Sequence, residues 1–261
     1  MPSVTSQSES LVQYLRKASR ILVFTGAGVS TGSGIPDFRG PEGIWKRRQP
    51  VYYQDFMGSE AARVEHWDYK LEGWPAFRNA QPNATHKAIR QLEAASKLLM
   101  VVTQNIDGLH AKARTEPERL VELHGTNSLV ECQTCHCQFD PTSYFEDFCK
   151  SRRPPRCECG GFLKLATISF GQSLRPEDLH RAEEAARNAD LVVALGSTLS
   201  VYPAAEIPLL AARHGAPYVI VNRGPTEHDG FPSVKLRLEG DVLEIFPQAV
   251  SAALPLSSER L

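Results

Sequence analysis

The chain has 261 residues, a formal net charge of −1 and 42% hydrophobic residues. This length suits one large domain with small appendages, and the near-zero net charge argues against a strongly basic nucleic-acid binder. No apolar run approaches the roughly 20 residues that a membrane-spanning helix needs, and residues 1–19 lack the apolar core of a secretory signal. We therefore expect a cytoplasmic protein whose partners include neither nucleic acid nor membrane. We also expect it to be monomeric.

Six apolar runs of strand length predict a sheet. Their apolar character is continuous rather than alternating, which is typical of strands buried on both faces of a parallel sheet. Helical patterns lie between them, and Thr85, Pro176 and Pro203 mark expected helix starts. This alternation predicts an α/β fold with a Rossmann-like doubly wound parallel sheet. The expected strands are 21–25, 98–103, 119–123, 191–195, 218–222 and 234–238, and the expected helices lie near 85–96, 176–188, 203–214 and 241–253.

Two segments interrupt this alternation. Residues 41–84 contain all three tryptophans among many charges and prolines, and they predict an inserted helical module. Residues 128–166 contain all six cysteines and predict a small zinc-binding module. The remaining segments form the predicted Rossmann-like domain, which comprises residues 1–40, 85–127 and 167–261.

A glycine-rich turn, GAG at residues 26–28, follows the first apolar run. Glycines there allow a tight turn and let backbone N–H groups approach a pyrophosphate, although a purely structural turn has the same pattern. The acidic residue expected about 20 positions further on in a usual dinucleotide fingerprint is missing. The chain continues instead into Asp37, Phe38 and Arg39. An arginine here suits phosphate pairing and a phenylalanine suits the covering of a planar ring, whereas the alternative for Asp37 and Arg39 is a solvated or mutually paired loop.

Polar side chains follow the next two apolar runs. Gln104, Asn105 and Asp107 come at the end of the second run, and His124 comes just after the third. The carboxyl ends of parallel strands are where α/β proteins bind ligands. A single histidine after a strand is usually structural, but the amide and carboxylate groups expected at the same sheet edge favour a site.

The cysteines cluster in one short segment, which points to a metal rather than to a disulfide framework. Four thiolates can form a closed, tetrahedral structural zinc site. The second pair has one intervening residue, so Cys137 is a possible substitute ligand, while Cys149 looks like a helical or core residue; a reduced, metal-free ribbon is the alternative. The predicted ligands are Cys132, Cys135, Cys157 and Cys159.

Taken together, these segments resemble the sirtuin family over residues of roughly 20 to 250. The matching segments, in order, are GAGVS, GIPDFRG, TQNID, LHG, the paired cysteines, FGQ, GSTLSVYPA and VN. The resemblance implies a bacterial-type NAD-dependent protein lysine deacylase, an enzyme of the acyltransferase class that acts on acylated-lysine proteins. In that family NAD loses nicotinamide and the acyl oxygen attacks the ribose, which yields free lysine, nicotinamide and O-acyl-ADP-ribose.

The resemblance also implies roles for individual residues. His124 would be the general base that activates a ribose hydroxyl, since an imidazole titrates near working pH. Asn105 and Asp107 complete the expected catalytic set, with Asn105 positioning the ribose or the attacking water. The residues expected to bind NAD are Gly26, Ala27, Gly28, Ser30, Ile35, Asp37, Phe38, Arg39, Trp45, Gln104, Asn105, Ile106, Asp107, Gly196, Ser197, Thr198, Asn222, Arg223, Gly224 and Val242.

On the substrate side, segments 167–172 and 199–203 resemble the family loops that pair with the peptide backbone. Family members that prefer malonyl, succinyl or glutaryl lysine carry a Tyr-x-x-Arg pair, for which this chain has Trp67 and Lys70. Lysine is a poorer bidentate partner for a carboxylate, so we expect acetyl removal, with some acidic-acyl activity through Lys70. Alternatively, Trp67 packs the helical module and Lys70 is solvated. The residues expected to bind substrate are Trp67, Lys70, Phe170, Gly171 and Val201.

Two other functions share part of this pattern. A mono-ADP-ribosyltransferase or an NAD glycohydrolase would also cleave the nicotinamide bond, but the two peptide-pairing loops favour deacylation. A non-catalytic NAD-sensing scaffold would have no need of His124 beside Asn105 and Asp107.

Overall fold

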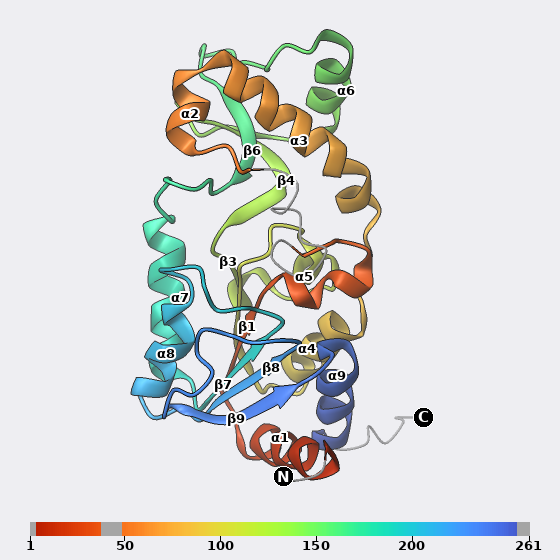
Figure 1. Ribbon diagram of the computed structural model, residues 1–261, viewed down its shortest axis with the longest axis vertical. Coiled ribbons are helices and arrows are strands. Elements are labelled where there is room, and N and C mark those ends of the chain that lie inside the picture. The colour runs from red at the N-terminus through yellow and green to blue at the C-terminus, as the bar shows by residue number, and fades with distance from the viewer. Residues whose placement is uncertain (1–3, 38–48, 255–261) are drawn as a thin grey trace.

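The structure is a computed structural model that describes residues 4–37 and 49–254 (Figure 1). Its largest element is a six-stranded sheet in which all neighbouring strands are parallel. The strand order, β3-β2-β1-β7-β8-β9, is that of a doubly wound Rossmann-like sheet and confirms the predicted fold class. The strands are β1 Ile21–Thr25, β2 Leu98–Thr103, β3 Leu120–Glu122, β7 Leu191–Leu195, β8 Tyr218–Asn222 and β9 Val234–Glu239.

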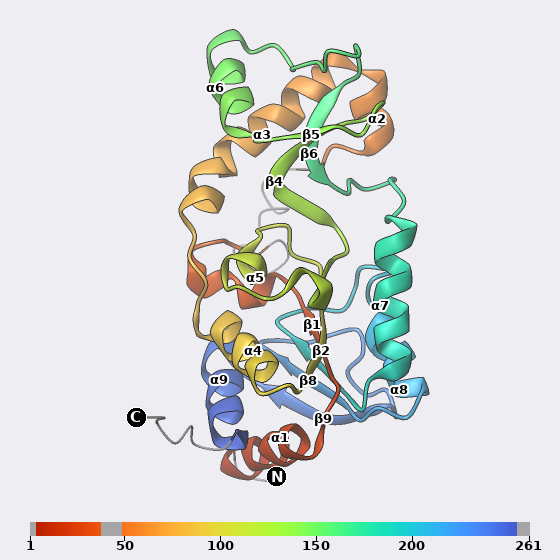
Figure 2. The ribbon, with the colours of Figure 1, turned by 180° about the vertical axis from the view of Figure 1, so that it is seen from behind.

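Helices cover both faces of this sheet (Figures 1 and 2). Side chains of α1 (Val4–Lys17), α4 (Ala84–Ala94) and α9 (Val242–Ala253) pack into one apolar core cluster. Side chains of α7 (Pro176–Asn188) and α8 (Glu206–Arg213) pack into a second cluster on the other face. Burial on both sides explains why the strands read as continuous apolar runs.

The predicted helix near 85–96 is confirmed as α4, and Thr85 lies in its first turn. Its cap is Asn83, whose side chain accepts the N–H of Thr85 at 3.0 Å and so satisfies a first-turn donor. The predicted helix start at Pro203 was wrong. Helix α8 begins at Glu206 with Ala205 as its N-cap, so Pro203 lies in the preceding loop. The predicted start of α7 at Pro176 is confirmed.

A smaller lobe lies at the other end of the molecule, at the top of Figure 1. Its antiparallel sheet has the order β5-β4-β6, and three helices pack around it. The elements are β4 Gly125–Cys132, β5 Gln138–Phe139, β6 Leu163–Thr167, α2 Tyr53–Gly58, α3 Glu60–Asn79 and α6 Thr142–Ser151. The residue limits of the helical and zinc-binding modules stay predictions.

Trp67 forms the core of this lobe, so the prediction that it binds substrate was wrong. Its side chain is 0% exposed and packs against Phe145 and Phe148, with ring centroids 5.4 and 5.8 Å away. Its indole N–H donates to the carbonyl of Leu163 at 3.1 Å. Burying so large an aromatic side chain with a satisfied N–H stabilises the packing of α3 on β6.

Among the residues that the structure describes, no helix is long and apolar enough to cross a membrane.

Candidate active site

A cleft of about 1200 Å³ opens at the carboxyl ends of the parallel strands, which is where doubly wound sheets bind ligands. Loops after β1, β2, β7 and β8 line one side of it, and the small lobe lines the other. The predicted NAD-binding residues that line it are Gly26, Ala27, Gly28, Asp37, Gln104, Asn105, Ile106, Gly196, Ser197, Thr198, Asn222, Arg223, Gly224 and Val242. Phe38, Arg39 and Trp45 lie outside the described residues.

The turns after β1 and β7 pack backbone against backbone. Gly28 N–H donates to the carbonyl of Gly196 at 2.8 Å, and Gly26 N–H donates to that of Leu195 at 3.0 Å. A Cβ atom on Gly28 would lie 2.8 Å from the Cα of Gly196, which is too close for any side chain. The glycines therefore bring bare backbone to the floor of the cleft, where it can approach a bound phosphate group.

A small recess branches off beside this turn. Asn105 donates from Nδ2 to the carbonyl of Gly26 and to Ser30 Oγ, each at 3.1 Å, and Ser30 in turn donates to Asp107 Oδ2 at 2.7 Å. Burial raises the pKa of Asp107, and hydrogen bonds from the Leu109 N–H and from Ser30 oppose the shift. Ser30, Ile35 and Asp107 line this recess rather than the main cleft.

His124 stands at the cleft wall after β3. Its Nδ1 lies 3.0 Å from the carbonyl oxygen of Gln104. A carbonyl can only accept, so Nδ1 carries the proton and the neutral ring presents Nε2 as its basic atom. The side chain of Gln104 donates to Ser197 Oγ at 2.8 Å, so the same residue links the histidine to the turn after β7.

The two loops expected to hold a peptide both line the cleft. Ile168 N–H donates to the carbonyl of His124 at 2.8 Å, which ties the first loop to the histidine. Helix α2 supports the same loop, because Tyr53 N–H donates to the carbonyl of Phe170 at 2.9 Å. The predicted substrate residues Phe170, Gly171 and Val201 line the cleft.

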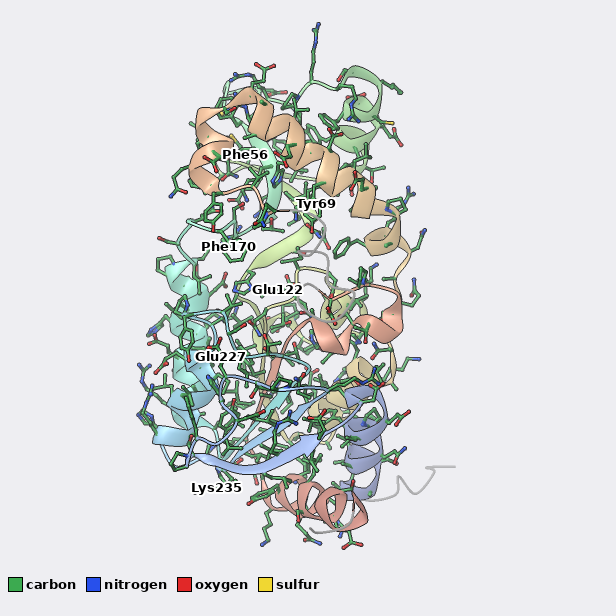
Figure 3. The ribbon with its side chains drawn as sticks, in the orientation of Figure 1. Phe56, Tyr69, Glu122, Phe170, Glu227 and Lys235 are labelled. Carbon is green, nitrogen blue, oxygen red and sulfur yellow. The ribbon has the colours of Figure 1, made fainter. Side chains whose placement is uncertain are left out.

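His66, Tyr69 and Lys70, on one face of α3, line the end of the cleft on the side of the small lobe, which is called the far end below. Figure 3 places Tyr69 and Phe170 where the small lobe meets the sheet. Prediction from the sequence found Lys70 but missed His66 and Tyr69. Positions i, i+3 and i+4 share one helix face, and that pattern was the signal available.

Three basic side chains lie at or next to this end of the cleft. Lys70 Nζ donates to a neutral partner, Asn127 Oδ1, at 2.9 Å, and burial lowers the pKa of Lys70 to about 8. Behind it, Lys164 is 1% exposed; burial and then the charge of Lys70 lower the pKa of Lys164 to about 7. Burial lowers the pKa of His66 well below its usual value, and His66 Nε2 has no hydrogen-bond partner within the described residues.

Four cysteine thiols come together at the tip of the small lobe. The candidate ligand atoms of Cys132, Cys135, Cys157 and Cys159 all lie within 4.8 Å of one another, with Sγ–Sγ distances of 3.5 Å for 132–159 and 3.7 Å for 135–157. Sulfurs around a tetrahedral zinc with bonds of about 2.3 Å stand about 3.8 Å apart, so the geometry fits a structural zinc. Cys137 is not part of this cluster, and Cys149 lies exposed on α6.

Comparison with known proteins identifies the family of this chain. The profile of the Sir2 family matches residues 26–203. The chain belongs to the Sir2 family. Its sirtuin relatives include the NAD-dependent protein deacetylase of Rhodopseudomonas palustris, 40% identical over 237 residues that cover 90% of this chain and 94% of the relative. They also include the NAD-dependent protein deacylase 2 of Archaeoglobus fulgidus, 36% identical over 95% of this chain and 96% of the relative.

Solved sirtuin structures have the same fold. A Sir2 protein with a deacetylated peptide and 3′-O-acetyl ADP-ribose superposes with a TM-score of 0.85 at 33% identity, covering 94% of this chain and 97% of that one. A Sir2 protein with a peptide and NAD⁺ superposes with a TM-score of 0.82 at 32% identity, covering 93% and 97%. The fold described above is thus that of a sirtuin.

Proposed function

We propose that this sirtuin removes acyl groups, chiefly acetyl, from lysine side chains of proteins and consumes NAD in doing so. The observation that carries the proposal is the place of His124. Its ring is held with Nε2 as the basic atom, at a cleft that has bare glycine backbone on one side and a peptide-pairing loop on the other. Relatives named as NAD-dependent deacetylases and a deacylase support the same activity.

Different residues of the cleft would bind NAD, orient the reacting groups and transfer the proton. Bound NAD would supply an ADP-ribosyl group that is activated by loss of nicotinamide. Backbone N–H groups at residues 26–28 and the turns after β7 and β8 would hold its phosphates and adenosine. Asn105 would orient the ribose and the reacting oxygen, and His124 would take a proton at Nε2 from a ribose hydroxyl. Ile106 and Asp107 would line the place of the nicotinamide ring.

The test is nicotinamide release by purified protein given NAD with and without an acetyl-lysine peptide. Deacylation requires that release depend on the peptide and that O-acetyl-ADP-ribose appear with it. Equal release without peptide would make the protein a glycohydrolase, and transfer of ADP-ribose onto protein would make it a transferase. Binding of NAD without any turnover would indicate a non-catalytic, NAD-sensing scaffold.

A second class of acyl group, the dicarboxylic acyls such as succinyl, is favoured by Lys70 at the far end of the cleft. Lys70 reaches the cleft and is bonded to a neutral amide rather than to a carboxylate. An acyl carboxylate arriving there would gain a charge-assisted hydrogen bond. Comparable rates on succinyl and acetyl peptides would overturn the acetyl preference.

Replacement of Lys70 by methionine is expected to separate the two classes. It should lower kcat/KM for a succinyl peptide by about tenfold or more, the value of a lost charge-assisted bond, and leave that for an acetyl peptide within about threefold. Lys235→Met removes an exposed lysine on β9 and is the matched control. A succinyl rate that Lys70→Met leaves unchanged would exclude Lys70 as the acyl partner.

The pH dependence should follow the same lysine. Because burial lowers the pKa of Lys70 to about 8, its charge is present below that pH and is lost above it. The ratio of succinyl to acetyl activity should therefore fall as the pH rises from about 7 to about 9, and Lys70→Met should remove the change.

The proposal extends to the partners, the oligomeric state and the cellular location of the protein. The expected partners are acylated-lysine proteins, which the peptide-bound sirtuin structures support by similarity. We propose that the protein acts as a monomer in the cytoplasm and has no nucleic-acid or membrane partner, in keeping with its formal net charge of −1.

A further inference from the structure

The turn that follows β8 forms one wall of the cleft. Asn222, Arg223 and Gly224 line the cleft there. Gly224 has a φ of +81°, a left-handed conformation that other residues adopt only at a cost. Asn222 donates from Nδ2 to the carbonyls of Arg223 and Gly224, at 3.1 and 3.0 Å. Bonds within three residues do not by themselves fix where the turn lies relative to the sheet.

Arg237, on the neighbouring edge strand β9, holds this turn from behind. Its Nη1 donates to the carbonyl of Asn222 at 3.0 Å and to that of Leu238 at 2.6 Å. Its Nη2 donates to the carbonyl of Gly224 at 2.6 Å. The planar guanidinium thus bonds both ends of the turn at once, which the compact ammonium of a lysine cannot reproduce.

Two carboxylates complete the arrangement. Arg237 Nε donates to Asp229 Oδ1 at 2.8 Å and Nη2 donates to Glu239 Oε2 at 2.9 Å, so all five N–H donors of the side chain are used. Glu239 also accepts the N–H of Gly224 at 2.7 Å. Asp229 accepts from Thr226 through both the backbone N–H and the hydroxyl, at 2.9 and 2.7 Å. The guanidinium is therefore saturated and lies beside two opposite charges, so it is not available to bind a phosphate itself.

We propose that Arg237 is a positioning residue for the NAD reaction, one that holds the Asn222–Gly224 turn in the shape that receives the adenosine half of NAD. This rests on the proposed function, because that function places the adenosine at this turn. Arg237 acts through the turn and lies outside the residues that line the cleft. It should therefore affect affinity for the dinucleotide and leave unchanged the chemistry at His124, which follows a different strand.

The test compares Arg237→Lys and Arg237→Gln with the wild type. ADP-ribose is the binding probe, measured by titration calorimetry, because it carries the adenosine half and needs no turnover. We expect the Kd for ADP-ribose and the KM for NAD to rise about fivefold in Arg237→Lys and about tenfold or more in Arg237→Gln. The kcat at saturating NAD and the KM for the acetyl peptide should stay within about twofold. Arg187→Lys, which alters an exposed i,i+4 ion pair with Glu183 on α7, is the matched control and should change none of these values.

The outcomes separate this inference from the proposed function. A wild-type protein that fails to bind ADP-ribose would overturn both. A wild type that binds it, with an Arg237→Lys variant that binds equally well, would overturn the inference alone. A fall in kcat with unchanged ADP-ribose affinity would also overturn it. If Arg237→Gln does not unfold cooperatively, the decision rests on Arg237→Lys, whose folding is checked by its thermal transition.

Discussion

Replacement of His124 by alanine is expected to abolish peptide-dependent nicotinamide release almost completely. A positioned general base contributes typically 10²–10⁴-fold to a rate, and His124 is the residue whose ring is fixed with a basic nitrogen at the cleft wall. We expect a loss of about 10² or more in kcat for the acetyl peptide. Binding of ADP-ribose should persist, because the glycine turn and the turns after β7 and β8 are unchanged.

The measurement combines steady-state kinetics with ADP-ribose titration. His214→Ala is the matched control, since His214 is exposed and bonds the carbonyl of Leu210 at the end of α8. A His124→Ala variant that keeps more than a tenth of the wild-type kcat would show that another group takes the proton. Loss of ADP-ribose binding in the same variant would mean that the substitution had disturbed the cleft and not only the base.

Removal of the zinc ligands is expected to unfold the small lobe. A structural zinc stabilises small metal modules by about 10–16 kcal/mol in peptides, and Cys132 is buried in the core cluster that contains Trp67. In Cys132→Ala, or after chelation, we expect bound zinc to fall from about one per chain to near zero. The activity should fall with it, because Lys70 and the loop around Phe170 are positioned by this lobe.

Metal analysis, circular dichroism and thermal unfolding report this loss directly. Cys149→Ala is the control, because Cys149 is exposed on α6 and outside the four-thiol cluster. Retention of zinc by Cys132→Ala would indicate that Cys137 replaces it as a ligand. An active, fully folded protein without zinc would contradict a structural role for the metal.

The sheet was predictable from the sequence because its strands are buried on both faces. Their runs stand out as continuous apolar segments, and four of the six have the expected limits: β1, β2, β7 and β8. The other two are edge strands: β3 proved shorter than expected and β9 one residue longer. The polar groups after β2 and β3 were predictable for a related reason, since parallel strands bring their carboxyl ends to one edge.

Other features depend on the phase of a helix or on the register between two strands, and neither can be read from a single sequence. Trp67 was assigned to the substrate site by its place in a motif, but it faces the lobe core, while His66 and Lys70 face the cleft. The bonds of Arg237 depend on the register in which Asn222 pairs with Glu239, and nothing in the local sequence specifies that register. The cap at Asn83 was missed because the capping residue precedes the helical pattern.

The indole of Trp67 has its hydrogen-bond acceptor 96 residues further along the chain. A ribosome adds about 5–20 residues each second, so α3 emerges roughly 5 to 20 s before the strand that completes its core. During that interval the nascent chain carries an uncovered tryptophan face and cannot yet complete the zinc site, whose last cysteine is Cys159. Folding of the small lobe therefore waits for β6, and the acyl end of the cleft forms only after the metal ligands have emerged, while α7, α8 and α9 are still to be synthesised.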